Sequence, residues 1–163
     1  MPVCGIALLC ACTATTGSRT VTMATLEDAP TSPLERPEQR VVADPQVLRE
    51  LCTPLGPRLG LLQVRCQADW RRLANAAGPI GACPDLREGI VLGLACWAGT
   101  PIDGQWPVHI QAVRVCEGGG LVQADFETGS YLPDGTARLE TAHVKGLGTV
   151  LAVDVNGTMF YPK

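Results

Sequence analysis

The chain has 163 residues, of which 46% are hydrophobic, yet only seven are aromatic. Its net charge of −3 and the lack of any Lys/Arg run argue against nucleic acid and anionic membrane surfaces as partners. No apolar run approaches the roughly 18 residues of a membrane-spanning helix. Every aromatic residue lies beyond residue 69. Since large apolar side chains mark the core, we expect one folded domain over residues 46–163.

Residues 1–12 are typical of an export leader, because a short apolar stretch is followed by small polar residues. The segment Leu9-Cys10-Ala11-Cys12 resembles the bacterial lipoprotein box, in which Cys12 would carry the lipid. No Lys or Arg precedes the apolar stretch, so an ordinary secretory signal and a buried apolar strand remain alternatives. The leader predicts an extracytoplasmic place in the bacterial envelope, either lipid-anchored, periplasmic or secreted.

Residues 13–45 are rich in Thr, Pro and mixed charges and contain no aromatic residue. Such a composition buries too little apolar surface to offset the entropy of an ordered chain. We therefore expect a flexible tether between the leader and the domain.

The domain begins with helix and strand signals in alternation. Asp44-Pro45 is a favourable start for a short helix, and residues 61–66 have the apolar character of a strand. Trp70, Leu73, Ala74 and Ala77 share one helical face, and Gly78-Pro79 ends that helix. Residues 90–97 are apolar on both faces, which indicates a central strand covered on both sides.

Beyond residue 100 the apolar period becomes two, as in strands. The apolar positions change face near Ala112, which predicts a β-bulge. Residues 122–127 alternate as a half-buried strand, and Asn156-Gly157 between two apolar runs predicts a hairpin. The expected fold class is α+β, with one or two helices packed on a mainly antiparallel β-sheet.

Five cysteines belong to the predicted domain, and an odd number leaves at least one thiol without an intramolecular partner. Cys66 and Cys83 flank the predicted helix, while Cys96 and Cys116 lie on consecutive strands, so each pair is a candidate disulfide. Several of these cysteines could equally be small buried hydrophobic residues. No spacing of Cys and His in the domain suggests a metal site.

The sequence shows no set of residues suited to catalysis. Ser130 does not stand in a nucleophile elbow. His109 lies between two apolar residues of a predicted strand, so its side chain is expected to face solvent, and His143 is assigned to a Gly-rich loop. A cysteine-dependent enzyme would need an exposed thiol of low pKa, so it is the lesser alternative. We predict a protein that is not an enzyme and needs no cofactor.

Residues 84–110, PDLREGIVLGLACWAGTPIDGQWPVHI, resemble the C-terminal domain family of the bacterial protease complex subunit PrcB. Asp85 matches the family's turn, residues 90–97 its apolar strand, and the glycine-containing segment after them its loop. The chain departs from the family at Gln105, where the family has glycine, and at Trp106, where it has tyrosine. The resemblance implies an envelope-attached accessory domain without an active site, in a family whose named member assists a surface protease complex.

Residues 99–107 form a loop that proline stiffens and that carries a large aromatic side chain. Such a loop loses little entropy on binding, so we predict a protein-binding surface made by Gly99, Thr100, Pro101, Gly104 and Trp106. Trp106 could equally fold back over the edge of the sheet.

The expected function is a binding or assembly module attached to the envelope, for example an accessory subunit of an extracytoplasmic protease complex. The alternatives are a protease-inhibitor-like domain and a purely structural secreted domain.

Overall fold

The computed structural model describes residues 21–163, so Cys12 and the predicted leader lie outside the described residues. Of the described residues, 46% are in strands and 15% in three short helices. The prediction of an α+β fold with helices on one sheet is therefore wrong, and the protein is β-rich. The alternating segments after residue 100 do not join the earlier strands in one sheet. They form a separate sheet that packs face to face on the sheet of residues 89–96 and 59–64, and the side chains between the two sheets make most of the core.

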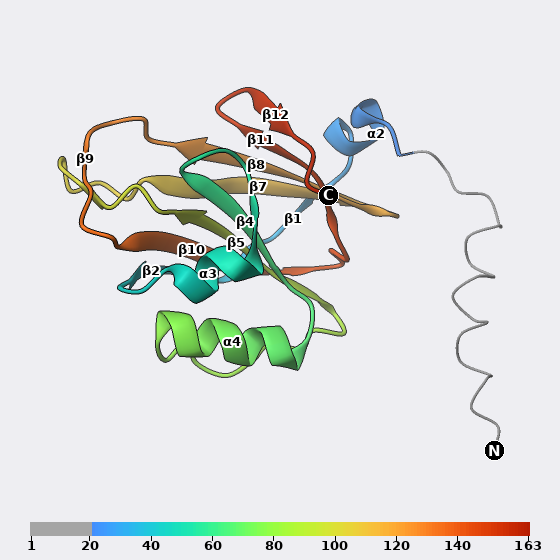
Figure 1. Cartoon of the computed structure of the whole chain (residues 1–163). Coiled ribbons are helices and arrows are strands. Elements are labelled where there is room, and N and C mark those ends of the chain that lie inside the picture. Colours follow the sequence, from blue (N-terminus) through green and yellow to red (C-terminus); the bar gives the residue numbers. More distant parts are fainter. Residues whose placement is uncertain (1–20) are drawn as a thin grey trace, which may run out of the picture.

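Two five-stranded sheets and one two-stranded sheet carry the fold (Figure 1). The first sheet contains, in spatial order, β1 (Thr31–Ser32), β7 (Val108–Cys116), β8 (Gly119–Phe126), β11 (Val150–Val155) and β12 (Thr158–Phe160). The second sheet contains β2 (Glu35–Val42), β10 (Ala137–Lys145), β5 (Gly89–Cys96), β4 (Leu59–Val64) and β3 (Cys52–Pro54). The two-stranded sheet pairs β6 (Thr100–Pro101) with β9 (Tyr131–Leu132). The helices are α2 (Met23–Glu27), α3 (Gln46–Leu51) and α4 (Gln67–Ala77).

Apolar side chains fill three layers. The largest cluster lies between the two five-stranded sheets and includes Leu92, Val113 and Val153, which are fully buried. A second cluster, which includes Leu48 and Leu73, fills the space between the second sheet and the helices α3 and α4. A third, smaller cluster lies under α2, on the outer face of the first sheet. The two sheets thus form a sandwich with short helices on its outer faces.

Several predicted elements are confirmed. All eight residues of β5 are buried, because the strand has neighbours on both edges and apolar layers on both faces. The pairing of β7 with β8 shifts between Ile110 and Ala112, as the predicted bulge requires. The hairpin of β11 and β12 turns through Asn156 (φ 52°) and Gly157 (φ 84°), both in the left-handed region that such a turn needs.

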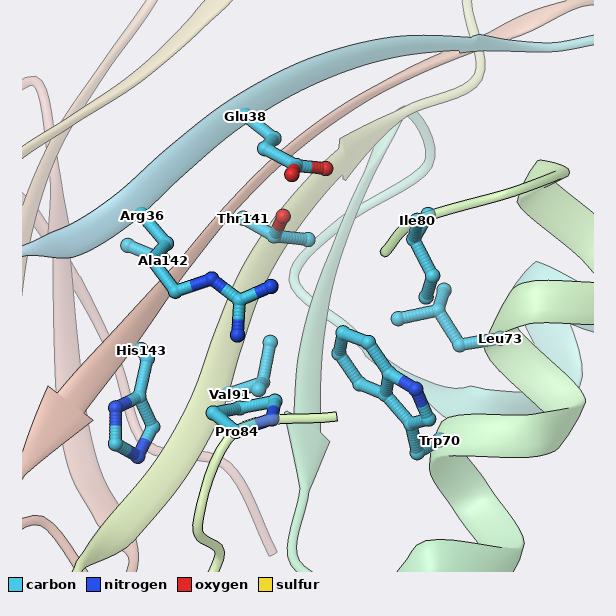
Figure 2. Close-up of a pocket in the computed structure, with 10 residues that line it drawn as sticks. All are labelled: Arg36, Glu38, Trp70, Leu73, Ile80, Pro84, Val91, Thr141, Ala142 and His143. Carbon is cyan, nitrogen blue, oxygen red and sulfur yellow. The ribbon is translucent and has the colours of Figure 1, made fainter. Parts of the chain in front are cut away.

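Helix α4 also follows its sequence pattern. It covers Gln67–Ala77 and ends at Gly78, whose φ of 79° is open to glycine at little energetic cost. Its apolar face meets the second sheet, where Leu73 is fully buried and Trp70 is half-buried. This contact makes one wall of a pocket that Arg36 and His143 also line (Figure 2).

The prediction of a flexible tether is wrong from Thr22 onward, and the folded unit begins before residue 46. Leu26 of α2 and Val42 of β2 are buried, and β2 pairs along β10 as an edge strand of the second sheet. An edge strand has one neighbour and two partly solvated faces, so it tolerates charged residues and Pro. The sequence of β2, ERPEQRVV, therefore lacks the apolar alternation that would have revealed it.

Within residues 21–163, no helix is both long and apolar enough to cross a membrane.

Candidate functional site

The predicted binding loop folds as one half of a two-stranded ribbon. Thr100 and Pro101 of β6 pair with Leu132 and Tyr131 of β9, which come from a segment about thirty residues later in the chain. We call this ribbon, with the turn that follows β6, the β6–β9 tip. Figure 1 shows β9 at the end of the molecule opposite to α2 and to the C-terminus. The turn is closed by a hydrogen bond from Gly104 N to Pro101 O of 3.3 Å.

A cluster of polar side chains anchors the tip. The Thr100 hydroxyl donates to the Asp134 carboxylate and accepts a hydrogen bond of 3.0 Å from Arg138 Nη2. Asp134 also accepts hydrogen bonds from the backbone N–H (3.1 Å) and the hydroxyl (2.6 Å) of Thr136. The hydrogen bonds from Thr100 and Thr136 lower the pKa of Asp134 to about 2. Arg138 lies on β10 and is only 8% exposed. The anchor therefore connects the ribbon to a buried side chain of the second sheet.

Trp106 closes one end of the core and is not an exposed contact. Its ring packs against the cluster between the two sheets, and the Arg138 guanidinium carbon lies 6.0 Å from its ring centroid. The sequence left two positions open for Trp106, exposed on the loop or folded back over the sheet. In the structure the indole is folded back over the sheet. Gln105 does not need the conformational freedom of glycine, because its φ is negative: Arg36 and Asn156 are the only non-glycine residues with positive φ in the described chain.

The tip exposes two aliphatic side chains beside the polar side chains of Asp103 and Gln105. Ile102, in the turn after β6, is 63% exposed, and Leu132 on β9 is 56% exposed. Beside them, Tyr131 is fixed: its hydroxyl donates to Glu127 O, its ring stacks on Phe126 with centroids 6.4 Å apart, and burial raises its pKa to about 12. The tip therefore presents two apolar side chains on a rigid backbone.

All five described cysteines are free thiols, so neither candidate disulfide is formed. Cys96 ends a strand of the second sheet, whereas Cys116 ends a strand of the first, and the cross-strand bridge would have required both in one sheet. Cys66 and Cys83 both line a surface groove beside the start of α4, without being joined.

Burial disfavours the ionised form of three of the five cysteines that the structure describes. Burial raises the pKa of Cys52 to about 12, and burial also raises the pKa of Cys83 and Cys96. The His109 side chain is 42% exposed, with Nδ1 3.6 Å from Glu140 Oε1. Over residues 21–163, no three His, Cys, Asp or Glu side chains are grouped in a way that could hold a metal ion.

His143 is the residue that the sequence interpretation misplaced. It lies on β10 and not in a Gly-rich loop, and it is 5% exposed. β10 has β2 and β5 on its two edges and apolar residues on both faces, so its sequence shows no simple alternation. The glycines at 146 and 148 then favoured a loop assignment. The apolar residues Ala142 and Val144 on either side of His143 were the signal for a strand that the sequence offered.

No protein family, curated protein or solved structure was found that matches the chain.

Proposed function

We propose that the protein is a non-enzymatic binding module that contacts a partner protein through the β6–β9 tip. The observation that carries this proposal is the pair of exposed aliphatic side chains, Ile102 and Leu132, on a ribbon whose backbone is already fixed. Two of the four large hydrophobic residues that are exposed in the described chain lie on this tip.

Energetic reasoning favours the tip as a contact surface. Full burial of an aliphatic side chain of this size contributes about 1.5–3 kcal/mol. Ile102 and Leu132 are more than half exposed, so a partner that covers them gains a large part of this free energy. The Thr100–Asp134–Arg138 anchor fixes the ribbon before binding, so that a partner orders little additional chain.

The wider setting of this function rests on the sequence. The leader-like segment ending at Cys12 supports attachment to the bacterial envelope, and the resemblance of residues 84–110 supports an accessory role beside an extracytoplasmic protease. Under this proposal the partner is a subunit of such a complex, and the membrane is reached only through the lipid on Cys12.

Capture from an envelope extract of the producing cells tests the proposal. The full chain should retain a defined partner, and the double variant Ile102→Asp/Leu132→Asp should lose it. The matched control is Tyr161→Asp, because Tyr161 is also 63% exposed but follows β12 near the C-terminus. Proteolytic activity in the captured fraction would identify the partner as part of a protease complex.

Each variant is checked by thermal unfolding before it is compared. The substituted side chains are exposed, so we expect changes of at most about 0.5 kcal/mol in the free energy of unfolding. Equal capture by the wild-type chain and a folded double variant would contradict the proposed surface.

A further inference from the structure

The sandwich is incomplete along the side where β1 passes into β2. β1 is the edge strand of the first sheet and β2 is the edge strand of the second, and only residues 33 and 34 separate them in the chain. β1 has two residues, whereas β2 has eight. Within residues 21–163, no other strand of the first sheet lies beyond β7 on this side, so most of β2 has no strand opposite it.

The alternation of side chains shows which face of β2 is left uncovered. Glu38 lines the pocket beside α4, on the outer face of the second sheet (Figure 2). Neighbouring residues of a strand point to opposite faces, so Gln39 and Val41 point toward the first sheet. Glu140, which pairs with Gln39, accepts a hydrogen bond from Ile110 N of β7, in agreement with this direction. Val41 is nevertheless 54% exposed, because the first sheet does not extend over it.

β7 has a free edge beside this uncovered face. β8 pairs with β7 from Val108 to Cys116, whereas β1 pairs with only two residues in the second half of β7. In the described part of the chain, residues 108–112 therefore have a neighbouring strand on one side only. We call the surface formed by this free edge and by the inner face of β2 at Gln39 and Val41 the β7 edge.

The backbone hydrogen bonds show which groups lie along the free edge. Glu127 N donates to Pro107 O, so this carbonyl faces β8. Ile110 N donates instead to Glu140 Oε2, away from β8. Backbone groups alternate in direction along an antiparallel strand, so those of Val108 also point away from β8. The amide and carbonyl groups of Val108 and the carbonyl of Ile110 are thus directed to the side where a further strand would lie.

The β7 edge is acidic. The Glu140 side chain reaches it and is 13% exposed, with Oε1 3.0 Å from Gln39 Nε2 and 3.6 Å from His109 Nδ1. On β8, the Asp125 carboxylate accepts a hydrogen bond of 2.6 Å from Gln111 Nε2. Among the ion pairs of residues 21–163, none joins either carboxylate to Lys or Arg. Their charges are therefore available to a basic partner.

The arginine on the same face of the second sheet is already engaged. Arg138 pairs with Val41 in the sheet, but it is 8% exposed and donates hydrogen bonds to the hydroxyls of Thr100 and Thr136. Its charge also contributes to the lowered pKa of Asp134. Arg138 is thus balanced within the anchor of the tip and leaves the two carboxylates of the β7 edge uncompensated.

We propose that the β7 edge binds an extended segment of a partner protein in which Lys or Arg alternates with apolar residues. The segment continues the line of β1 and pairs with Val108 and Ile110 as an added strand. Its apolar side chains cover Val41 on the inner face. One of its carbonyl groups replaces Glu140 on Ile110 N, and the released carboxylate pairs with a basic side chain.

The charges favour a partner protein over a second copy of this chain. In edge-to-edge pairing of two copies through residues 108–112, the two Glu140 carboxylates approach each other, and like charges on facing strands are destabilising. A segment that carries Lys or Arg has the complementary charge instead.

Selection from a displayed library of random octapeptides on the full chain tests the proposal. We expect enrichment of peptides in which Lys or Arg alternates with Val, Ile or Leu. An enriched peptide should bind at least about 10-fold more tightly than the same peptide with Glu at its basic positions. Hydrogen exchange followed by NMR then shows whether the peptide pairs with the edge. The protection factor of the Val108 amide should rise at least about 10-fold in the complex.

Variants locate the binding. Val41→Lys places a charge on the inner face, a feature that prevents strand addition at sheet edges, and should weaken peptide binding at least about 10-fold. Tyr161→Lys is the matched control, because it makes the same change at an exposed residue near the C-terminus and should bind as the wild type does. Glu140→Gln keeps an acceptor for Ile110 N without the charge and should also weaken binding. Circular dichroism first shows that each variant is folded.

Four results would overturn the proposal: no enriched peptide, no preference for Lys or Arg over Glu, an unchanged Val108 protection factor in the complex, or unchanged affinity in a folded Val41→Lys variant. The double variant Ile102→Asp/Leu132→Asp should bind the peptides normally. Peptides that this double variant loses and Val41→Lys retains would bind at the tip, which would support the proposed function and contradict a site at the β7 edge.

Discussion

At the scale of single residues, the segment 99–107 assigns its apolar side chains to different roles. Trp106, the largest, packs on the core under Arg138, while the smaller Ile102 remains 63% exposed. This division follows from the pairing of β6 with β9, which draws the ends of the segment onto the sandwich and leaves only the turn outside. The same pairing brings Gly99 against the backbone of β9. A Cβ added at Gly99 would overlap the carbonyl oxygen of Leu132.

We therefore expect Gly99→Ala to destabilise the protein by about 3 kcal/mol or more, from the backbone clash together with its φ of 101°. Gly104→Ala is the matched control: its φ is 73°, but no atom lies within 4 Å of the added Cβ. It should lower the free energy of unfolding by only about 1–2 kcal/mol. Urea unfolding of both variants measures the difference, and equal losses would show that the close approach to β9 has no energetic weight.

At the scale of elements, the β6–β9 ribbon has only two residues in each strand and depends on its polar anchor. Asp134 joins Thr100 of β6 to Thr136 beyond β9, and these contacts favour its ionised form. The pKa of Asp134 in the folded protein, about 2, is below its usual 3.8. A carboxylate with a lowered pKa stabilises the fold above its unfolded pKa, and that stabilisation is lost as the pH falls through the folded value.

Acid should therefore loosen the tip before the sandwich. Between pH 4 and pH 2 we expect the protection factors, which are corrected for the intrinsic exchange rate at each pH, to fall at Ile102 and Leu132, while those of the central strand β5 stay high. Asp134→Asn should show the lowered protection factors already at neutral pH and lose most of their pH dependence. Hydrogen exchange followed by NMR measures both. Protection factors of the tip that do not change with pH in the wild-type chain would show that Asp134 does not hold the ribbon.

Local patterns were sufficient for elements whose signal is local. The face shared by Trp70 and Leu73 predicted α4, and Asn156-Gly157 predicted the final hairpin. The pairing of strands that are far apart in the chain could not be predicted from local sequence patterns. β2 is charged because it is an edge strand, and its partner β10 follows about a hundred residues later. Two separate sheets therefore could not be distinguished from one.

The candidate sites were predicted only in part, for the same reason. The sequence indicated residues 99–107 as the contact loop, but only the pairing with β9 shows that Leu132 joins Ile102 at the surface. The pocket lined by Arg36, His143 and Trp70 needs β2, β10 and α4 together. Arg36 and His143, which both line it, were assigned from the sequence to a tether and to a loop, so no local pattern could have joined them.

At the scale of the whole molecule, the segment before residue 46 belongs to both sheets. β1 pairs with β7 at the edge of the first sheet, and β2 pairs with β10 at the edge of the second. α2 covers the outer face of the first sheet through Leu26, which is 3% exposed, and Val42 at the end of β2 is 1% exposed. The N-terminal segment thus ties the two layers of the sandwich together along one side.

Truncation tests how much stability this segment provides. A chain that begins at Val21 keeps every contact described above, and we expect it to unfold cooperatively. A chain that begins at Asp44 loses α2, β1 and β2, and burying Leu26 and Val42 alone contributes about 1.5–3 kcal/mol each. Domains of this size are stable by about 5–15 kcal/mol, so the shorter chain should be near the limit of folding.

The loss of β2 also turns β10 into an edge strand with unpaired backbone groups, so the shorter chain should associate through that edge. Urea unfolding followed by circular dichroism, with light scattering for association, compares the two chains at equal concentration. We expect a lower midpoint and concentration-dependent scattering for the chain from Asp44. If both chains unfold at the same midpoint and stay monomeric, residues 21–43 act as a tether after all, and the strand pairing of β2 contributes nothing to stability.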